Sequence, residues 1–132
     1  MSFNFGAALA VFLAGTSAPG TDGTTTPQTV QQNTPLIAPV ALKALMAVPG
    51  KFLLVDVRQP DEFATGHIEG AILMPLDTIT TAYRNLPKDV KLVIYCRAGG
   101  RSAKAVSYLV SHGYTKAVSL DGGFTAWLAL PQ

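Results

Sequence analysis

The stretch LVIYCRAGGRSAKAVSYLVSH, residues 92–112, decides the fold. It begins with four consecutive apolar or aromatic residues, which is typical of a strand buried on both faces. A loop with two glycines follows, and residues 102–112 then have a helical pattern that Gly113 ends in the position after the C-cap. A buried strand that leads directly into a helix indicates a parallel α/β fold.

The same alternation of strand and helix continues on both sides of this stretch. Pro39 suits the first position of a helix, and Asp77 is a plausible N-cap. The pattern predicts strands at residues 36–37, 52–57, 71–73, 91–95 and 117–120, and helices at residues 39–46, 61–64, 78–85, 102–112 and 124–130. We therefore expect an α/β fold with a parallel sheet of about five strands, flanked by helices on both faces.

Composition limits the class of protein. The chain has 132 residues, of which 48% are apolar and 14% charged, so it can form one domain with a hydrophobic core and is not disordered throughout. The net charge is +2, and the ten basic residues are scattered along the sequence. Without a basic cluster, we expect no nucleic-acid partner.

The N-terminal residues differ from the rest of the chain. Residues 1–35 hold one charged side chain; residues 3–14 are apolar, and residues 16–35 are rich in Thr, Gln, Gly and Pro. We interpret residues 1–35 as an apolar leader and a flexible linker, and residues 36–132 as the domain. The apolar run is too short for a stable membrane span.

The leader is compatible with two cellular compartments. The apolar run has the length of the central region of a signal peptide, and small residues follow it at positions 16–18. The absence of a basic residue before the run, and Pro19 after it, count against cleavage. Export to the periplasm follows if residues 1–18 are a signal peptide or its remnant, and a cytoplasmic location follows otherwise.

Cys96 is the single cysteine of the chain. It therefore cannot form an internal disulfide, a CxxC redox pair or a cysteine-rich zinc site, and we expect neither a metal nor a cofactor. Its place before a helix N-terminus, near Arg97 and Arg101, favours the thiolate, the reactive form. Gly99 and Gly100 allow the backbone N–H groups of the loop to converge on an anion. The alternative is a buried, inert thiol.

Four motifs resemble one known family. They are DVR at residues 56–58 with Glu62 and Phe63, GHIEGA at 66–71, CRAGGRS at 96–102, and DGG at 121–123 followed by Trp127. Together, in this order and spacing, they resemble the single-domain rhodaneses, which are sulfurtransferases with a parallel α/β fold. The likeness extends from about Leu36 to Leu130 and does not include the leader.

The resemblance implies roles for named residues. Cys96 matches the nucleophile that takes a sulfane sulfur from a donor such as thiosulfate and holds it as a persulfide. Asp56 and Arg58 match an acid–base pair beside the active-site loop. Residues 66–68 match a mainly structural signature. The loop that matches the cradle of the sulfur consists of Arg97, Ala98, Gly99, Gly100, Arg101 and Ser102.

Further roles follow from the residues themselves. Arg58 and Glu62 are four residues apart, so we expect them to pair, and we expect Asp56 to orient an arginine of the loop. Transfer from a thiolate needs no general base, so His67 is interpreted as structural. His112 ends a helix and is expected at the surface, and Trp127 is expected in the core.

The spacing from Cys96 to Arg101 bears on the choice between sulfur and phosphorus chemistry. Four residues separate them, one fewer than in the Cys-x5-Arg loops of related phosphatases, so the smaller ring of N–H groups suits a single sulfur atom. A non-catalytic persulfide carrier or interaction module is the main alternative, and a cysteine-based phosphatase a weaker one. We expect an anionic sulfur donor and an external acceptor, either cyanide-like or a thiol, including a thioredoxin-like protein.

Overall fold

A computed structural model describes residues 34–48 and 50–131. The predicted leader and most of the predicted linker, residues 1–33, lie outside this part of the chain, so the boundary at residue 36 stays a prediction. The strands are β2 (Leu36–Ile37), β3 (Phe52–Asp56), β4 (Ile72–Leu73), β5 (Lys91–Tyr95) and β6 (Ala117–Leu120). They form one sheet in the order β2-β6-β5-β3-β4, and all neighbouring strands are parallel.

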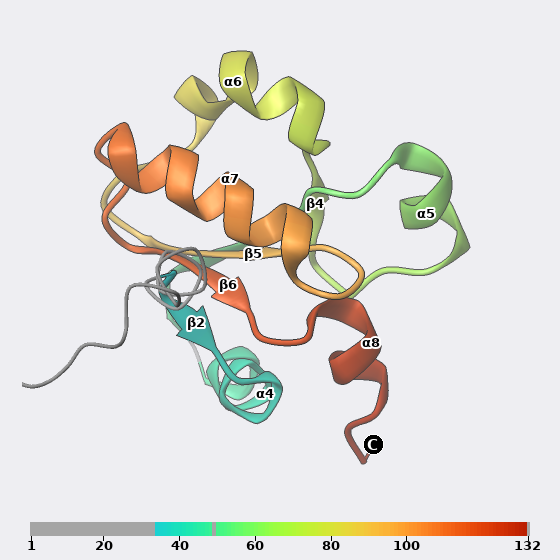
Figure 1. Ribbon diagram of the computed structural model, residues 1–132. Helices are drawn as coiled ribbons and strands as arrows, with labels where there is room; N and C mark the ends of the chain where they lie inside the picture. Colours follow the sequence, from blue (N-terminus) through green and yellow to red (C-terminus); the bar gives the residue numbers. More distant parts are fainter. Residues whose placement is uncertain (1–33, 49, 132) are drawn as a thin grey trace, which may run out of the picture. The chain divides into compact units, whose positions relative to one another are not determined.

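Helices lie on both sides of this sheet (Figure 1). Helices α6 (Ile79–Ala82) and α7 (Gly100–Ser111) lie on one side, and α4 (Pro39–Ala47) and α8 (Gly123–Leu128) on the other. Helix α5 (Pro60–Thr65) lies beyond the end of the sheet at which β3 ends. The prediction of a parallel α/β fold with about five strands and two helical layers is confirmed.

The central strand β5 and Cys96, the residue that follows it, contribute side chains to two hydrophobic clusters. Leu92, Ile94 and Cys96 belong to the cluster beneath α7, whereas Val93 and Tyr95 belong to the cluster beneath α4 and α8. Successive side chains of a strand point to opposite faces, so a strand covered on both sides is typically apolar on both faces. All five of these residues are at most 1% exposed.

The region after β4 differs from the prediction. The expected helix at residues 78–85 is divided into a 3₁₀ turn, η3 (Leu76–Thr78), the short helix α6, and a second 3₁₀ turn, η4 (Tyr83–Asn85). Asp77 lies inside η3 and does not cap a helix, so that prediction was wrong. The segment has two consecutive threonines and no side-chain cap, and β-branched residues lower the propensity for a long helix.

Elsewhere the boundaries shift by one or two residues. Helix α7 begins at Gly100 rather than Ser102, and α8 ends at Leu128 rather than Leu130. Gly113 has a φ of +94° directly after the C-cap of α7, as its position predicts. No helix within the described part of the chain is long and apolar enough to cross a bilayer.

Candidate active site

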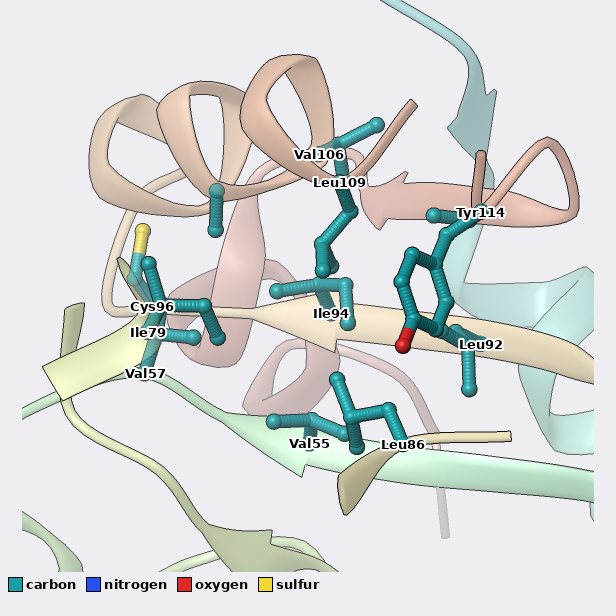
Figure 2. Close-up of a cluster of buried hydrophobic side chains, with 12 residues drawn as sticks. Val55, Val57, Ile79, Leu86, Leu92, Ile94, Cys96, Val106, Leu109 and Tyr114 are labelled. Atoms are coloured by element: carbon teal, nitrogen blue, oxygen red, sulfur yellow. The ribbon is translucent and has the colours of Figure 1, made fainter. Parts of the chain in front are cut away.

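Cys96 is the first residue after β5, and it lies at the end of the cluster beneath α7 (Figure 2). It is 1% exposed. The chain turns from the strand into α7 within four residues, and Gly99, the N-cap, has a φ of +117°. A residue with a side chain rarely adopts that conformation, so glycine makes this tight turn possible.

The loop directs hydrogen-bond donors at the Cys96 sulfur. The backbone N–H groups of Gly99 and Ser102 donate to Sγ over 3.1 and 3.3 Å. The Ser102 hydroxyl oxygen lies 3.5 Å from Sγ. These groups belong to the first turn of α7 and its N-cap, where the helix dipole also favours negative charge.

These donors favour the thiolate of Cys96. Burial alone raises the pKa of a thiol, because the charged form loses its hydration. Hydrogen bonds from the Ser102 hydroxyl and from the backbone of Ser102, Gly99 and Ala98 outweigh burial, so the pKa of Cys96 lies below its ordinary value. The site therefore holds a thiol that ionises more readily than a free cysteine.

Arg101 forms an ion pair with Glu62. Its guanidinium makes two hydrogen bonds to the Glu62 carboxylate, from Nη1 to Oε1 over 2.8 Å and from Nη2 to Oε2 over 3.1 Å. Arg97 is 71% exposed, and its Nε lies 3.9 Å from Glu62 Oε2. The predicted pairing of Glu62 with Arg58 was therefore wrong, since α5 presents this carboxylate to the cysteine loop.

Arg58 pairs with Asp56 instead. Its side chain makes three hydrogen bonds of 2.7 to 3.0 Å to the Asp56 carboxylate and one of 2.7 Å to the Gly66 carbonyl. Both charged side chains are buried, at 4% and 0% exposure, and the guanidinium lies 4.6 Å from the centre of the Phe124 ring. The prediction that Asp56 orients a loop arginine was thus wrong, because Arg58 takes its oxygens.

Helix α8 donates backbone hydrogen bonds to the cysteine loop. The N–H of Phe124 donates to the Cys96 carbonyl over 2.8 Å, and the N–H of Thr125 donates to the Arg97 carbonyl over 3.0 Å. A Cβ on Gly123 would lie 2.5 to 2.6 Å from backbone atoms of Arg97 and Cys96. The DGG motif therefore permits a contact between backbones that fixes the carbonyls of the loop.

The remaining predicted residues lie elsewhere. His67 is exposed. Its ring stacks on that of Phe63 with the ring centres 3.7 Å apart, and its Nδ1 lies 2.9 Å from the Phe63 carbonyl oxygen, in agreement with a structural role. His112 is exposed, and Trp127 packs against the cluster beneath α4 and α8, as expected. The described residues hold no group of three His, Cys, Asp or Glu side chains suited to a metal ion.

Two contributors to the site could not be assigned from the sequence. Glu62 stands in the first motif, but nothing in the sequence shows that α5 turns it toward Arg101. Ser119 lies in β6, and its hydroxyl oxygen is 2.8 Å from that of Ser102. The only sequence feature that marks Ser119 is its hydroxyl group within the otherwise apolar strand AVSL.

Comparison with known proteins connects this geometry to a family. The model of the rhodanese-like domain matches residues 38–130. A sulfurtransferase of Allochromatium vinosum is 45% identical over 75 residues, which cover 57% of this chain and 70% of that protein. The thiosulfate sulfurtransferase GlpE of Pseudomonas putida is 38% identical over 77 residues, covering 58% of this chain and 70% of that protein.

A solved structure agrees with these relatives. The human single domain sulfurtransferase TSTD1 is 27% identical, with a TM-score of 0.70, and the match covers 76% of this chain and all of that one.

Proposed function

The chain belongs to the family of rhodanese-like domains, and on that premise we propose that it moves a sulfane sulfur from a donor such as thiosulfate to an acceptor through a persulfide on Cys96. Its relatives support sulfurtransferase activity in general. The donor and the persulfide intermediate are the proposal.

The proposed reaction has two displacement steps. The Cys96 thiolate attacks the outer sulfur of thiosulfate, the S–S bond of the donor breaks, and its electron pair leaves with sulfite. The product is a Cys96 persulfide anion. An external nucleophile such as cyanide or a thiolate then attacks the outer sulfur, the S–S bond of the persulfide breaks, and the thiolate of Cys96 returns.

One observation carries the proposal. The Gly99 and Ser102 N–H groups point at the Sγ atom of a buried cysteine, at the first turn of α7. Such donors stabilise an anion on sulfur without a metal or a base. They suit both the attacking thiolate and the persulfide anion.

Mass spectrometry of the intact protein after thiosulfate treatment tests the proposal directly. We expect wild type to gain about one sulfur mass, about 32 Da, which cyanide removes, and Cys96→Ser to gain nothing. In the thiosulfate:cyanide assay, we expect the same variant to fall to background. Full turnover by Cys96→Ser, or a wild type that never gains sulfur from any donor, would overturn the proposal.

A carrier role is the second candidate, and the pairing of Arg101 favours it. Glu62 accepts two of the five N–H donors of Arg101 and balances its charge, so this loop attracts an anionic donor less strongly than two unpaired arginines would. Sulfur delivery by a partner protein would not need a free arginine. A wild type that is poor with thiosulfate but becomes persulfidated by a protein or thiol persulfide would support this candidate.

The same pairing argues against a phosphatase. Glu62 already accepts two hydrogen bonds from Arg101 and balances its charge, which weakens the attraction of this arginine for a phosphoester. We expect no hydrolysis of p-nitrophenyl phosphate above that of Cys96→Ser.

A further inference from the structure

Ser119 is a buried polar residue on an otherwise apolar face of the sheet. It lies in β6 opposite Ile94 of β5, and it is 1% exposed. Ala117, two residues earlier on the same face, belongs to the hydrophobic cluster beneath α7. A buried hydroxyl destabilises the protein unless it is hydrogen-bonded, so its partner matters.

That partner is the Ser102 hydroxyl, 2.8 Å away. Ser102 Oγ also lies 3.2 Å from the Gly99 carbonyl oxygen and 3.5 Å from Cys96 Sγ. A hydroxyl has one proton to donate and two lone pairs to accept with. Ser102 can therefore donate to the sulfur or to a neighbouring oxygen, but not to both at once.

The charge on the sulfur selects the arrangement of the two hydroxyl groups. A neutral thiol can donate its own proton to Ser102 Oγ. A thiolate can only accept, so the Ser102 hydroxyl turns its proton toward Sγ and accepts the proton of Ser119 in turn. Hydrogen bonds in such a chain polarise and strengthen one another.

We propose that Ser119 is a positioning residue, which acts through the Ser102 hydroxyl to stabilise negative charge on the Cys96 sulfur. The inference rests on the proposed function in taking Cys96 as the nucleophile, and it adds a residue from β6 that no motif of the loop contains. Ser119 does not touch the sulfur. It supplies the hydrogen bond that leaves Ser102 free to donate to the sulfur.

Other charges near Cys96 must be separated from this effect. Arg97 and Arg101 come from the loop and α7, Glu62 from α5, and the Asp56–Arg58 pair from the end of β3. Strand β6 and helix α8 contain no ionisable side chain. Replacing Ser119 changes none of these charges, so a shift in the Cys96 titration reports on the hydroxyl.

The test is a pH titration of the ultraviolet absorbance of the thiolate, which belongs to Cys96 because the chain has one cysteine. Cys96→Ser serves as the blank. We expect Ser119→Ala to raise the pKa of Cys96 by roughly 0.5 to 1 unit. Ser119→Thr, which keeps a hydroxyl, should return it toward wild type. Ser107→Ala, which removes an exposed hydroxyl from α7, should leave it unchanged.

A double-variant cycle shows whether the effect passes through Ser102. We expect Ser102→Ala to raise the pKa of Cys96, and the addition of Ser119→Ala to raise it little further. Thermal unfolding checks that each variant is folded. A Ser119→Ala titration that superimposes on wild type, a Ser119→Thr titration equal to that of Ser119→Ala, or additive effects of the two alanine variants would each overturn the inference.

The two proposals fail separately. If wild type takes up sulfur on Cys96 while Ser119→Ala titrates as wild type does, the proposed function stands and the role of Ser119 falls. If no donor loads Cys96 while the titration still shifts in Ser119→Ala, then Ser119 lowers the pKa of Cys96, but the thiolate does not serve persulfide transfer.

Discussion

Glu62 joins two parts of the site through one carboxylate. It accepts two hydrogen bonds from Arg101 and one from the backbone N–H of Gln59 at the start of α5. These hydrogen bonds, that from Arg101 foremost, lower the pKa of Glu62 to about 2. The same group therefore caps α5, holds the arginine of the cysteine loop and stays ionised in moderate acid.

Replacing Glu62 by Gln tests this role. A carboxylate with a lowered pKa stabilises the fold fully above the pKa of an unfolded glutamate, about 4.3, and the contribution is lost as the pH falls toward 2. Because solvent screens this partly exposed ion pair, we expect Glu62→Gln to lower the free energy of unfolding by only roughly 1 to 2 kcal/mol at pH 7. Urea unfolding at pH 7 and near pH 2 measures this.

The difference in the free energy of unfolding between Glu62→Gln and wild type should shrink as the pH falls from about 4.5 to 2. Glu69→Gln, at an exposed glutamate, is the control and should change little. A difference that stays constant with pH would show that the charge of Glu62 is not the cause.

Single residues also show where sequence reasoning succeeds and fails. Cys96, Gly99 and Ser102 lie within one short segment, residues 96–102, so their spacing predicts a shared turn, and the structure places them together. The partners of Arg58 and Glu62 depend on where β3 and α5 point. Spacing by four applies within a helix, but Arg58 precedes α5 and lies beside Asp56 at the end of β3.

At the level of secondary structure, the contact between α8 and the cysteine loop leaves no room for a side chain at Gly123. Two N–H groups of α8 satisfy the Cys96 and Arg97 carbonyls, and Gly123 permits their approach. Its φ of +63° is a second reason for glycine at this position.

We predict that Gly123→Ala destabilises the protein by several kcal/mol, about 2 to 4, and abolishes sulfur loading, because the new Cβ would overlap backbone atoms that cannot move alone. Chemical denaturation and the thiosulfate mass assay measure both effects. Gly50→Ala is the matched control, since a Cβ there meets nothing within 4 Å. Equal stability of the two variants would contradict the prediction.

The secondary structure was predictable where the periodicity was unambiguous. The apolar runs before Asp56 and Cys96 have four residues each, a length that favours buried strands over helices, and both strands were found with their ends within one residue. The segment at residues 76–85 is held by packing of Ile79 and Tyr83 rather than by helical propensity, so its local sequence does not show where each turn ends. The contact of α8 with the loop joins segments far apart in the chain and has no local signal.

For the domain as a whole, the longest strand pairing lies at the middle of the sheet. Strands β3 and β5 pair over five residues and lie between the two hydrophobic clusters, whereas the edge strands β2 and β4 have two residues each. Amide groups exchange slowly where opening requires global unfolding.

We therefore predict that the amides of Leu54, Val55, Val93 and Ile94 exchange slowest, at the rate of global unfolding, and that those of β2 and β4 exchange at least about tenfold faster. Hydrogen exchange followed by NMR measures each strand. Equal protection of edge and centre would contradict the prediction.

The dependence of the cysteine loop on α8 has a consequence for synthesis. The ribosome makes residues 96–102 before residues 123–125, so a nascent chain that has just gained its cysteine still lacks the donors to the Cys96 and Arg97 carbonyls. We expect the loop to reach its final geometry only after α8 has emerged and folded. The thiol would thus gain its full reactivity only once α8 has folded against the loop, after all five strands of the sheet have been made.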